Sequence, residues 1–285
     1  MRGLRVLPDH PMTTETKSLR LERGDGIVEV VLCGPGKGNA MGPDLFRELP
    51  LCFGALDKDA ATRAVLLRGG GDNFCYGLDL MGMMPVLAPL VAGAGGAGER
   101  TQLLDMLTEL QTAVDSVARC RKPVVAAIHG WCVGGGLDLA AACDVRLCSA
   151  DAKFSLREIK LAIVADLGSL QRLPRIIGEG HTRELAFTGK NIDAAEAGRI
   201  GLVNAVCETP EKLLAVARAM VAEIAANPPL AVQGVKRVME WGDALSVAEG
   251  LRLVGAWNTA FLQSKDLQEA FAAFAEKRTP KFKGE

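Results

Sequence analysis

Residues 122–174 contain the strongest pattern in the chain, and their sequence is KPVVAAIHGWCVGGGLDLAAACDVRLCSADAKFSLREIKLAIVADLGSLQRLP. The apolar run from Val124 to Ile128 has the length and composition of a buried strand. Three glycines at 134–136 predict a turn, and a helix of small residues is expected to begin at Leu137. This order presents backbone N–H groups to whatever lies above the turn, since glycine has no Cβ atom to block a close approach.

Three carboxylates stand out within this stretch, namely Asp138, Glu158 and Asp166, and their surroundings are largely apolar. Carboxylates beside an anion-binding turn suit proton transfer at the carbon next to a carbonyl group. One carboxylate moves the proton while the N–H groups stabilise the negative charge that develops on oxygen. Crowded carboxylates in an apolar pocket cannot all ionise readily, so at least one pKa is expected above its ordinary value.

Each acid also has an ordinary structural interpretation. Asp138 would complement the dipole of the helix that it begins. Glu158 would form a surface ion pair with its neighbour Arg157. Asp166 would cap the next helix. Cys132, beside the turn, has a nucleophilic interpretation, but the sequence places no histidine as its base. The glycine turn lacks the spacing and the following lysine of a nucleotide phosphate loop.

Composition places the chain among ordinary globular proteins. It has 285 residues, 49% hydrophobic and 24% charged, with a formal net charge of −1. This length allows one large or two modest domains. The absence of long basic runs argues against nucleic-acid binding. The longest apolar run, 83–97, is broken by prolines and glycines, so no membrane span is predicted. We also find no secretory signal in the first residues.

Cysteine usage predicts a reducing compartment. The eight cysteines are scattered without C-x-x-C spacing, and the chain has three histidines, so no metal site is predicted. Most of the thiols lie among Val, Leu and Ala, where a reduced cysteine acts as a small hydrophobic residue. We therefore expect a cytoplasmic protein.

The rest of the chain alternates strands with helices. Residues 19–33 predict two strands joined at Gly24-Asp25-Gly26, and 43–58 has helical spacing. A short strand is expected at 64–68, and the proline- and glycine-rich residues 85–98 are expected to form a mobile loop or lid. A helix at 101–117 then leads into the strand of the opening stretch.

Alternation of this kind predicts an α/β fold with a largely parallel sheet. After residue 206 the periodicity is wholly helical, with breaks at Pro228-Pro229 and Gly242. We therefore divide the chain into a poorly ordered extension (1–18), an α/β core (19–205) and a helical C-terminal region (206–285). The remaining expected elements are strands at 145–148 and 153–156 and helices at 211–226, 230–241, 246–262 and 266–276.

Taken together, these residues resemble the crotonase (enoyl-CoA hydratase/isomerase) superfamily from about Leu19 onward. The resemblance is carried by FCYGLD at 74–79, the glycine turn with its carboxylate two residues on, Glu158, and GLV at 201–203. It implies a crotonase-like spiral of ββα units followed by a helical C-terminal region. It also implies a homotrimer or a dimer of trimers, with residues 206–285 acting as the trimerisation region.

The same resemblance implies a site for an acyl-CoA thioester. The N–H groups of Leu78 and Gly135 would form the oxyanion hole. No metal or separate cofactor is implied, because coenzyme A is part of the substrate. Tyr76 departs from the family pattern, which has a small residue before the loop glycine, and this affects the expected shape of the acyl pocket. The residues expected to contact substrate or CoA are Lys37, Tyr76, Gly77, Asp79 and Leu80.

Within the superfamily, the three acids and the run ADLGSLQRLP are similar to Δ3,5-Δ2,4-dienoyl-CoA isomerases. This similarity implies isomerisation of 3,5-dienoyl-CoA to 2,4-dienoyl-CoA in fatty-acid β-oxidation. Asp166 would take the proton from C2, Glu158 would serve C6, and Asp138 would tune both or hold a water or a proton. The chain does not end in a Ser-Lys-Leu-type signal, which suits a bacterial enzyme.

Two other functions stay open. A 2-enoyl-CoA hydratase, or a Δ3-Δ2 isomerase, would use the pair at 138 and 158, although a hydratase typically has glutamates at both positions. A non-catalytic acyl-CoA-binding subunit would share the fold, but such a protein has no use for three acids in an apolar pocket.

Overall fold

The computed structural model describes residues 16–92 and 96–285. Residues 1–15 of the predicted N-terminal extension (1–18) lie outside this description. Residues 16–18 are held to the core, because the backbone amides of Lys17 and Ser18 donate to the carboxylate of Glu48 at 2.9 and 3.0 Å.

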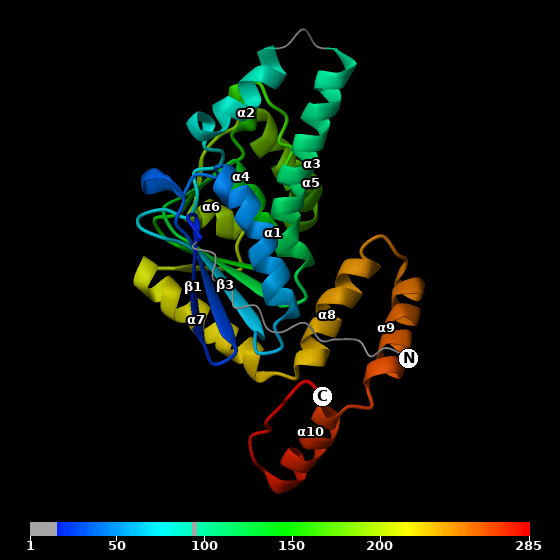
Figure 1. The fold of residues 1–285 in the computed structure, drawn as a ribbon. Coiled ribbons are helices and arrows are strands. Elements are labelled where there is room, and N and C mark those ends of the chain that lie inside the picture. The colour runs from blue at the N-terminus through cyan, green and yellow to red at the C-terminus, as the bar shows by residue number, and fades with distance from the viewer. Residues whose placement is uncertain (1–15, 93–95) are drawn as a thin grey trace.

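A six-stranded sheet forms the centre of the molecule (Figure 1). Its first two strands pair antiparallel through the predicted turn, and every later neighbour pairs parallel. Its strands, in spatial order, are β1 (Leu19–Gly24), β2 (Ile27–Leu32), β3 (Ala64–Gly69), β4 (Val124–Ile128), β6 (Val145–Ser149) and β9 (Ala205–Cys207).

A smaller three-stranded sheet lies beside it, formed by β5 (Trp131–Val133), β7 (Lys153–Ser155) and β8 (Ile192–Asp193). The strand β5 follows β4 after two residues, so the chain passes from one sheet to the other at Gly130, whose φ is +56°. The glycine turn therefore starts from the end of the smaller sheet.

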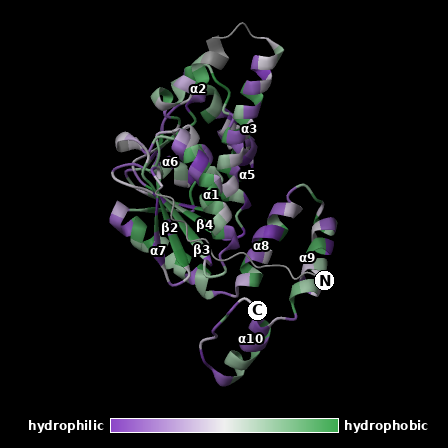
Figure 2. Ribbon diagram, viewed as in Figure 1, coloured by the Kyte–Doolittle hydropathy of each residue, from purple (hydrophilic) through white to green (hydrophobic). Residues whose placement is uncertain are grey.

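Helices pack on both faces of the large sheet. The apolar faces of strands β3, β4 and β6 meet the helix α7 (Pro210–Ala226) in a separate core cluster that includes Leu66, Val125 and Leu213. Figure 2 shows how strongly hydrophobic the central strands are. The opposite face packs against helices that include α1 (Pro43–Lys58), α3 (Ala97–Arg119), α4 (Gly135–Ala141) and α5 (Ser169–Thr188).

The last three helices extend away from this core, as Figure 1 shows. They are α8 (Pro229–Gly242), α9 (Val247–Phe261) and α10 (Lys265–Glu276), and their ends agree with the predicted helices to within about a residue or two. The remaining elements are α6 (Ala194–Arg199) and the short 3-10 helices η1 (Gly36–Gly38) and η2 (Glu158–Leu161).

The prediction of a loop at 85–98 is wrong. Residues Leu80–Ala92 form the helix α2, and α3 begins at Ala97, with 93–95 outside the described residues. An Asp79 carboxylate oxygen accepts from the backbone N–H of Gly82 at 3.0 Å, which satisfies a free donor at the start of α2. Met83 is buried against the core, and this packing outweighs the helix-breaking tendency of Pro85.

Candidate active site

The glycine turn joins β5 to α4. Gly134 has φ 52° and ψ −122°, a conformation that favours glycine, and its carbonyl accepts from the amides of Leu137 and Asp138 at 2.7 and 3.1 Å. The helix begins at Gly135, two residues before the predicted start at Leu137. Because the first N–H groups of a helix have no intrahelical partner, the amide of Gly135 is available to a ligand.

The 74–79 loop runs beside this turn. Cys75 pairs with the strand β5, donating to the Trp131 carbonyl and accepting from the Val133 amide, both at 2.9 Å. At Gly77, where φ is +81°, a Cβ atom would stand 2.6 Å from the carbonyl oxygen of Val133 and 3.1 Å from the nitrogen of Gly135. The structure therefore brings Leu78, the next residue, into the same region as Gly135.

Asp138 is fully buried in α4. Its Oδ1 accepts two hydrogen bonds from Ser169, from the backbone N–H at 2.6 Å and from the hydroxyl at 2.5 Å. Burial raises the pKa of Asp138 to about 6, although both Ser169 hydrogen bonds act in the opposite direction. Asp138 thus lies in the first turn of α4 and also accepts hydrogen bonds from the first residue of α5.

Glu158 is the first residue of η2, and its carboxylate faces the glycine turn. A Cβ atom built on Gly134 would lie 3.0 Å from its Oε1. Burial, together with the negative charges of Asp138 and Asp166, raises the pKa of Glu158 to about 7. Arg157 instead donates to Asn191 at 2.9 Å, so the expected surface ion pair between Arg157 and Glu158 is not formed.

Asp166 is half-buried on the segment before α5, and burial raises its pKa. Its backbone oxygen accepts from Gln111 on α3 at 2.8 Å. The interpretation of Asp166 as a helix cap is wrong, because α5 has Gly168 at its N-cap and no side-chain cap.

The three acids form one electrostatic cluster. The charge of Asp166 raises the pKa of both Asp138 and Glu158. Among the described residues, the buried side-chain atoms without a hydrogen-bond partner are Asp138 Oδ2 and Glu158 Oε2. Burying two acid oxygens without hydrogen-bond partners lowers the stability of the folded protein. Their place beside a glycine turn therefore points to a site that receives a ligand or a proton.

The residues expected to contact CoA lie at different depths. Tyr76 is 44% exposed, and its ring stacks with Trp131 at a centroid distance of 6.2 Å. These two rings, with Val133, Arg157 and Asn191, line an open pocket of about 460 Å³ next to the turn. An aromatic and cationic surface of this kind suits the polar part of a CoA thioester.

The other expected contacts are more varied. Gly77 is the close-approach glycine of the loop, while the Asp79 side chain caps α2. Leu80 is the first residue of α2 and is 43% exposed. Lys37 lies on η1, and its side chain is outside the described residues. Contact of these residues with CoA stays a prediction.

Sequence reasoning missed Ser169. It lies 31 residues from Asp138, and the sequence contains no motif that joins the two positions. Its place directly after Gly168, at the expected start of a helix, was the available signal, because such a serine commonly bonds to nearby groups.

Cys132 does not have the properties of a nucleophile. It is fully buried, and burial raises the pKa of its thiol well above the ordinary value, which disfavours the reactive thiolate. All eight cysteines are free.

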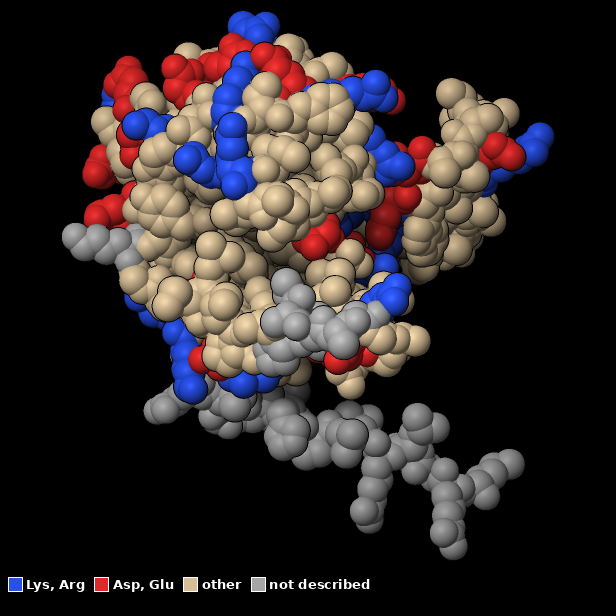
Figure 3. Space-filling view, turned by 90° about the horizontal axis from the view of Figure 1, so that it is seen from above, with Lys and Arg blue, Asp and Glu red and all other residues tan. Residues whose placement is uncertain are grey.

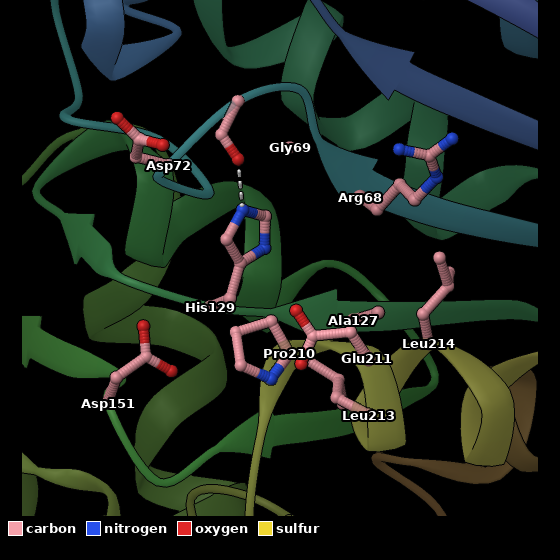
Figure 4. A pocket seen from close by; sticks show the side chains of 11 residues that line it. Arg68, Gly69, Asp72, Ala127, His129, Asp151, Pro210, Glu211, Leu213 and Leu214 are labelled. Carbon is pink, nitrogen blue, oxygen red and sulfur yellow. Dashed lines mark hydrogen bonds between the residues drawn. The ribbon is translucent and has the colours of Figure 1, made fainter.

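A further cavity of about 460 Å³ lies between the ends of β3 and β4 and the start of α7 (Figure 4). His129 points into it and bonds to the carbonyl oxygen of Gly71 at 2.8 Å. The pocket is lined by none of the three acids.

The described residues place two further limits on the site. Over 16–92 and 96–285, no group of three His, Cys, Asp or Glu side chains is arranged to hold a metal ion. In the same ranges, no single helix is long and apolar enough to cross a membrane, although the bent pair α7 and α8 passes that test together.

Figure 3 shows acidic and basic side chains interspersed over one face.

The family model for enoyl-CoA hydratase/isomerase matches residues 22–285. The chain belongs to this family, and its fold is the crotonase fold, as predicted. It is an isomerase of the family.

Curated relatives agree with this placement. The chain is 44% identical over 275 residues to the mitochondrial Δ(3,5)-Δ(2,4)-dienoyl-CoA isomerase of Dictyostelium discoideum, covering 95% of this chain and 92% of the relative. It is 40% identical to the mitochondrial enzyme of the same name from Homo sapiens, covering 95% and 82%. A carnitinyl-CoA dehydratase from Proteus mirabilis is 35% identical, covering 94% and 99%.

Solved structures show the same fold. The enoyl-CoA hydratase from Bacillus anthracis superposes with a TM-score of 0.84 at 33% identity, covering 94% of this chain and 100% of that one. An enoyl-CoA hydratase/carnithine racemase from Magnetospirillum magneticum superposes with a TM-score of 0.82 at 33% identity, covering 94% and 96%.

Proposed function

We propose that this protein converts 3,5-dienoyl-CoA to 2,4-dienoyl-CoA in fatty-acid β-oxidation. The observation that carries the proposal is the cluster of Asp138, Glu158 and Asp166 beside the glycine turn, with two buried carboxylate oxygens unpartnered. Relatives named dienoyl-CoA isomerase, 39–44% identical over most of the chain, support it.

The reaction moves one proton out and one proton in. Asp166 takes the proton from C2, and the electron pair of the broken C2–H bond forms a C1=C2 double bond while the carbonyl pair moves onto the thioester oxygen. When that oxygen pair re-forms the carbonyl group, the C1=C2 pair forms C2=C3, the former C3=C4 pair forms C4=C5, and the former C5=C6 pair takes a proton at C6 from Glu158. Asp166 ends protonated and Glu158 ionised, so the site is restored when a proton passes from Asp166 to Glu158, directly or through solvent.

The raised pKa values suit these roles. A base with a raised pKa is better matched to a weakly acidic C–H bond, and a carboxyl group with a pKa of about 7 carries a proton to deliver. Asp138 holds no obligatory proton in this scheme and acts on the other two acids through its charge.

Backbone amides stabilise the intermediate. Loss of the C2 proton gives a dienolate whose negative charge rests on the thioester oxygen. The N–H groups of Leu78 and Gly135 lie on adjoining segments and would donate to that oxygen. Each such donor is worth about 3–4 kcal/mol in comparable oxyanion holes. The pocket at Tyr76 and Trp131 would hold part of the CoA moiety.

The test is a side-by-side assay of a 3,5-dienoyl-CoA and crotonyl-CoA, following the absorbance of the conjugated product or substrate. Asp166→Asn and Glu158→Gln should each reduce kcat for the dienoyl substrate by about 10²–10⁴, the range for a positioned proton-transfer group. Asp138→Asn should cost less. Full dienoyl turnover by Asp166→Asn would refute the isomerase scheme. Crotonyl-CoA turnover that survives Asp166→Asn and is lost in Glu158→Gln would instead indicate a hydratase.

The assembly that we propose is a homotrimer or a dimer of trimers formed through the C-terminal helices. These helices expose large apolar side chains that a monomer would leave in water, including Met239 (72%), Val247 (81%) and Phe274 (86%). A groove of about 620 Å³ between α8 and the core adds apolar surface from Val232 and Val235.

The compartment that we propose is the cytoplasm of a bacterium, and the free thiols suit a reducing environment. Several relatives carry mitochondrial or peroxisomal in their names. Immunolocalisation of the tagged protein in its host, with a cytoplasmic and an envelope marker, would decide this.

A further inference from the structure

Ser169 and Asp138 are joined by an unusual contact. Ser169 is the first residue of α5, whose backbone leaves helical geometry at Gly178 (φ 77°, ψ 160°), and it is fully buried. Both its backbone N–H and its hydroxyl donate to one oxygen of Asp138, Oδ1, at 2.6 and 2.5 Å. The other oxygen, Oδ2, is buried without a partner. One oxygen of the carboxylate is therefore fixed by two hydrogen bonds, while the other has no hydrogen-bond partner.

This contact favours the ionised form of Asp138. A carboxylate that accepts two hydrogen bonds on one oxygen is stabilised as an anion, and its place at the N-terminus of a helix adds to that effect. Ser169 itself has no charge. It thus stabilises a negative charge at a position where burial alone would remove it.

Glu158 has no equivalent donor. The backbone amides at Arg157 and Glu158 lower its pKa only in part, and Oε2 is buried without a partner. The charge of Asp138 acts on it as the second-largest cause of its raised pKa, after burial. When one proton is available to the two acids, Asp138 and Glu158 compete for it, and the donors on Asp138 decide the outcome.

Other charged groups around the pair do not reverse this order. Asp166 is negative when ionised and raises the pKa of both acids. Arg172, on α5, lowers the pKa of Asp138, and it forms an ion pair with Asp115 on α3 at 2.6 Å. The thiol of Cys132, also close to Asp138, is neutral because burial raises its pKa.

We propose that Ser169 is a positioning residue that keeps Asp138 ionised and thereby leaves the shared proton on Glu158, ready for delivery. This assignment rests on the proposed dienoyl-CoA isomerisation for its role in turnover. The location of the proton itself is a property of the resting protein. The two can therefore be tested separately.

The test combines infrared spectroscopy with kinetics. The C=O stretch of protonated carboxyl groups is followed from about pH 5.5 to 8.5, where ordinary Asp and Glu side chains are already ionised. We expect the wild type to show a carboxyl signal that titrates near neutral pH and belongs to Glu158, so this signal should be absent from Glu158→Gln. In Ser169→Ala the signal should belong to Asp138 instead, so it should be absent from the double variant Ser169→Ala/Asp138→Asn. Loss of one charged hydrogen bond should raise the pKa of Asp138 by about one to two.

Kinetics provide the second readout. Ser169→Ala should lower kcat for a 3,5-dienoyl-CoA by about tenfold or more, with little change in KM, because the proton no longer resides on the delivering acid. Its pH–rate profile should shift with the spectroscopic midpoint. Ser169→Thr, which retains the hydroxyl, should restore both readouts. Ser169→Gly is a second variant without the hydroxyl.

Ser149→Ala is the matched control. Ser149 is also fully buried and donates its hydroxyl to a carboxylate, but that carboxylate is Asp151, at 2.5 Å, and Ser149 lies on β6 rather than at the start of α5. It should leave the infrared titration unchanged. The proposal is overturned if the proton in both Ser169→Ala and Ser169→Gly stays on Glu158 with an unchanged midpoint. A shifted titration in a protein that does not convert any dienoyl-CoA would refute the proposed function alone.

Discussion

The carboxylate of Glu158 lies directly against the backbone of Gly134. A Cβ atom built on Gly134 would stand 3.0 Å from Glu158 Oε1 and 3.6 Å from its carboxyl carbon. The same residue has φ 52° and ψ −122°, which side chains disfavour. A glycine at position 134 therefore does two things. It allows the backbone conformation that leads the chain into α4, and it leaves room for the Glu158 carboxylate beside the turn.

Gly134→Ala should consequently reduce activity more than stability. The added methyl group would displace Glu158 and strain the backbone at a cost of about 1–3 kcal/mol. We expect at least a hundredfold loss of kcat, since a small misplacement of a proton-transfer group is costly. Gly54→Ala in α1 is the control, because a Cβ atom there meets nothing within 4 Å. It should stabilise the helix by about 0.5–1 kcal/mol and leave kcat unchanged. Equal effects in the two variants would contradict this account.

The pH dependence of turnover should follow the two catalytic acids. Glu158 must be protonated to deliver a proton, so kcat/KM should fall as the pH rises through about 7. Asp166 must be ionised, so the rate should also fall as the pH decreases through its raised pKa. The apparent values belong to the coupled cluster. The residual activity of Glu158→Gln should lack the alkaline decline, and a persisting decline would assign that limb to another group.

Strands and most helices could be predicted from the sequence because their apolar residues repeat at the period of each element. The strand Val124–Ile128 is apolar throughout because both faces of the sheet are covered, and α1 has the predicted range, 43–58. The helix α2 was missed because Pro85 and the glycines after it outweighed a weaker signal. That signal was Asp79, one residue before the helix.

The site could be predicted only in part. Asp138, Glu158 and Asp166 were selected from local context and family resemblance, and the structure places all three in one electrostatic cluster. The contact between Asp138 and Ser169 could not be predicted, because the path of the chain between α4 and α5 brings them together. The ion pair expected from the adjacency of Arg157 and Glu158 is not formed, because Arg157 donates to Asn191 while the Glu158 carboxylate faces Gly134.

The stability of the folded protein should depend on the charge of Asp138. Its pKa is about 6 in the folded protein against an ordinary value of 3.8, so ionising Asp138 costs the folded state about 3 kcal/mol more than the unfolded state. At a pH below the ordinary value the group is neutral in both states and this cost is absent. The cost appears, and the free energy of unfolding falls, as the pH rises towards 6. Asp138→Asn should therefore raise the free energy of unfolding at pH 8 by up to about 3 kcal/mol, and by much less at pH 4.

Urea unfolding at the two pH values measures this difference. Asp44→Asn is a suitable control, because Asp44 lies on the surface in an ion pair with Arg47 at 2.5 Å. A surface pair of this kind contributes less than about 1 kcal/mol. If Asp138→Asn raises the free energy of unfolding no more at pH 8 than at pH 4, then the ionised Asp138 is not held at a cost in the folded protein.

Cys132 should be dispensable for turnover. It is fully buried, and its raised thiol pKa leaves no thiolate for nucleophilic attack. Cys132→Ala should retain kcat within about threefold while losing about 1 kcal/mol of stability through the small cavity. Loss of turnover without loss of folding, judged by circular dichroism, would revive the nucleophile interpretation.

The C-terminal helices should lose their assembly when their exposed apolar residues become charged. Phe274 on α10 is 86% exposed and Phe271 is 68% exposed, so neither contributes much to the fold of the single chain. If these rings are buried against a second copy, an aspartate at either position would place an unpaired charge in an apolar contact. Phe274→Asp should then shift the protein from trimer or hexamer towards monomer in sedimentation experiments. Leu51→Asp, at a residue on α1 that is 63% exposed, should leave the assembly unchanged. A wild type that sediments as a monomer, or a Phe274→Asp variant that sediments as the wild type does, would exclude α10 from the contact.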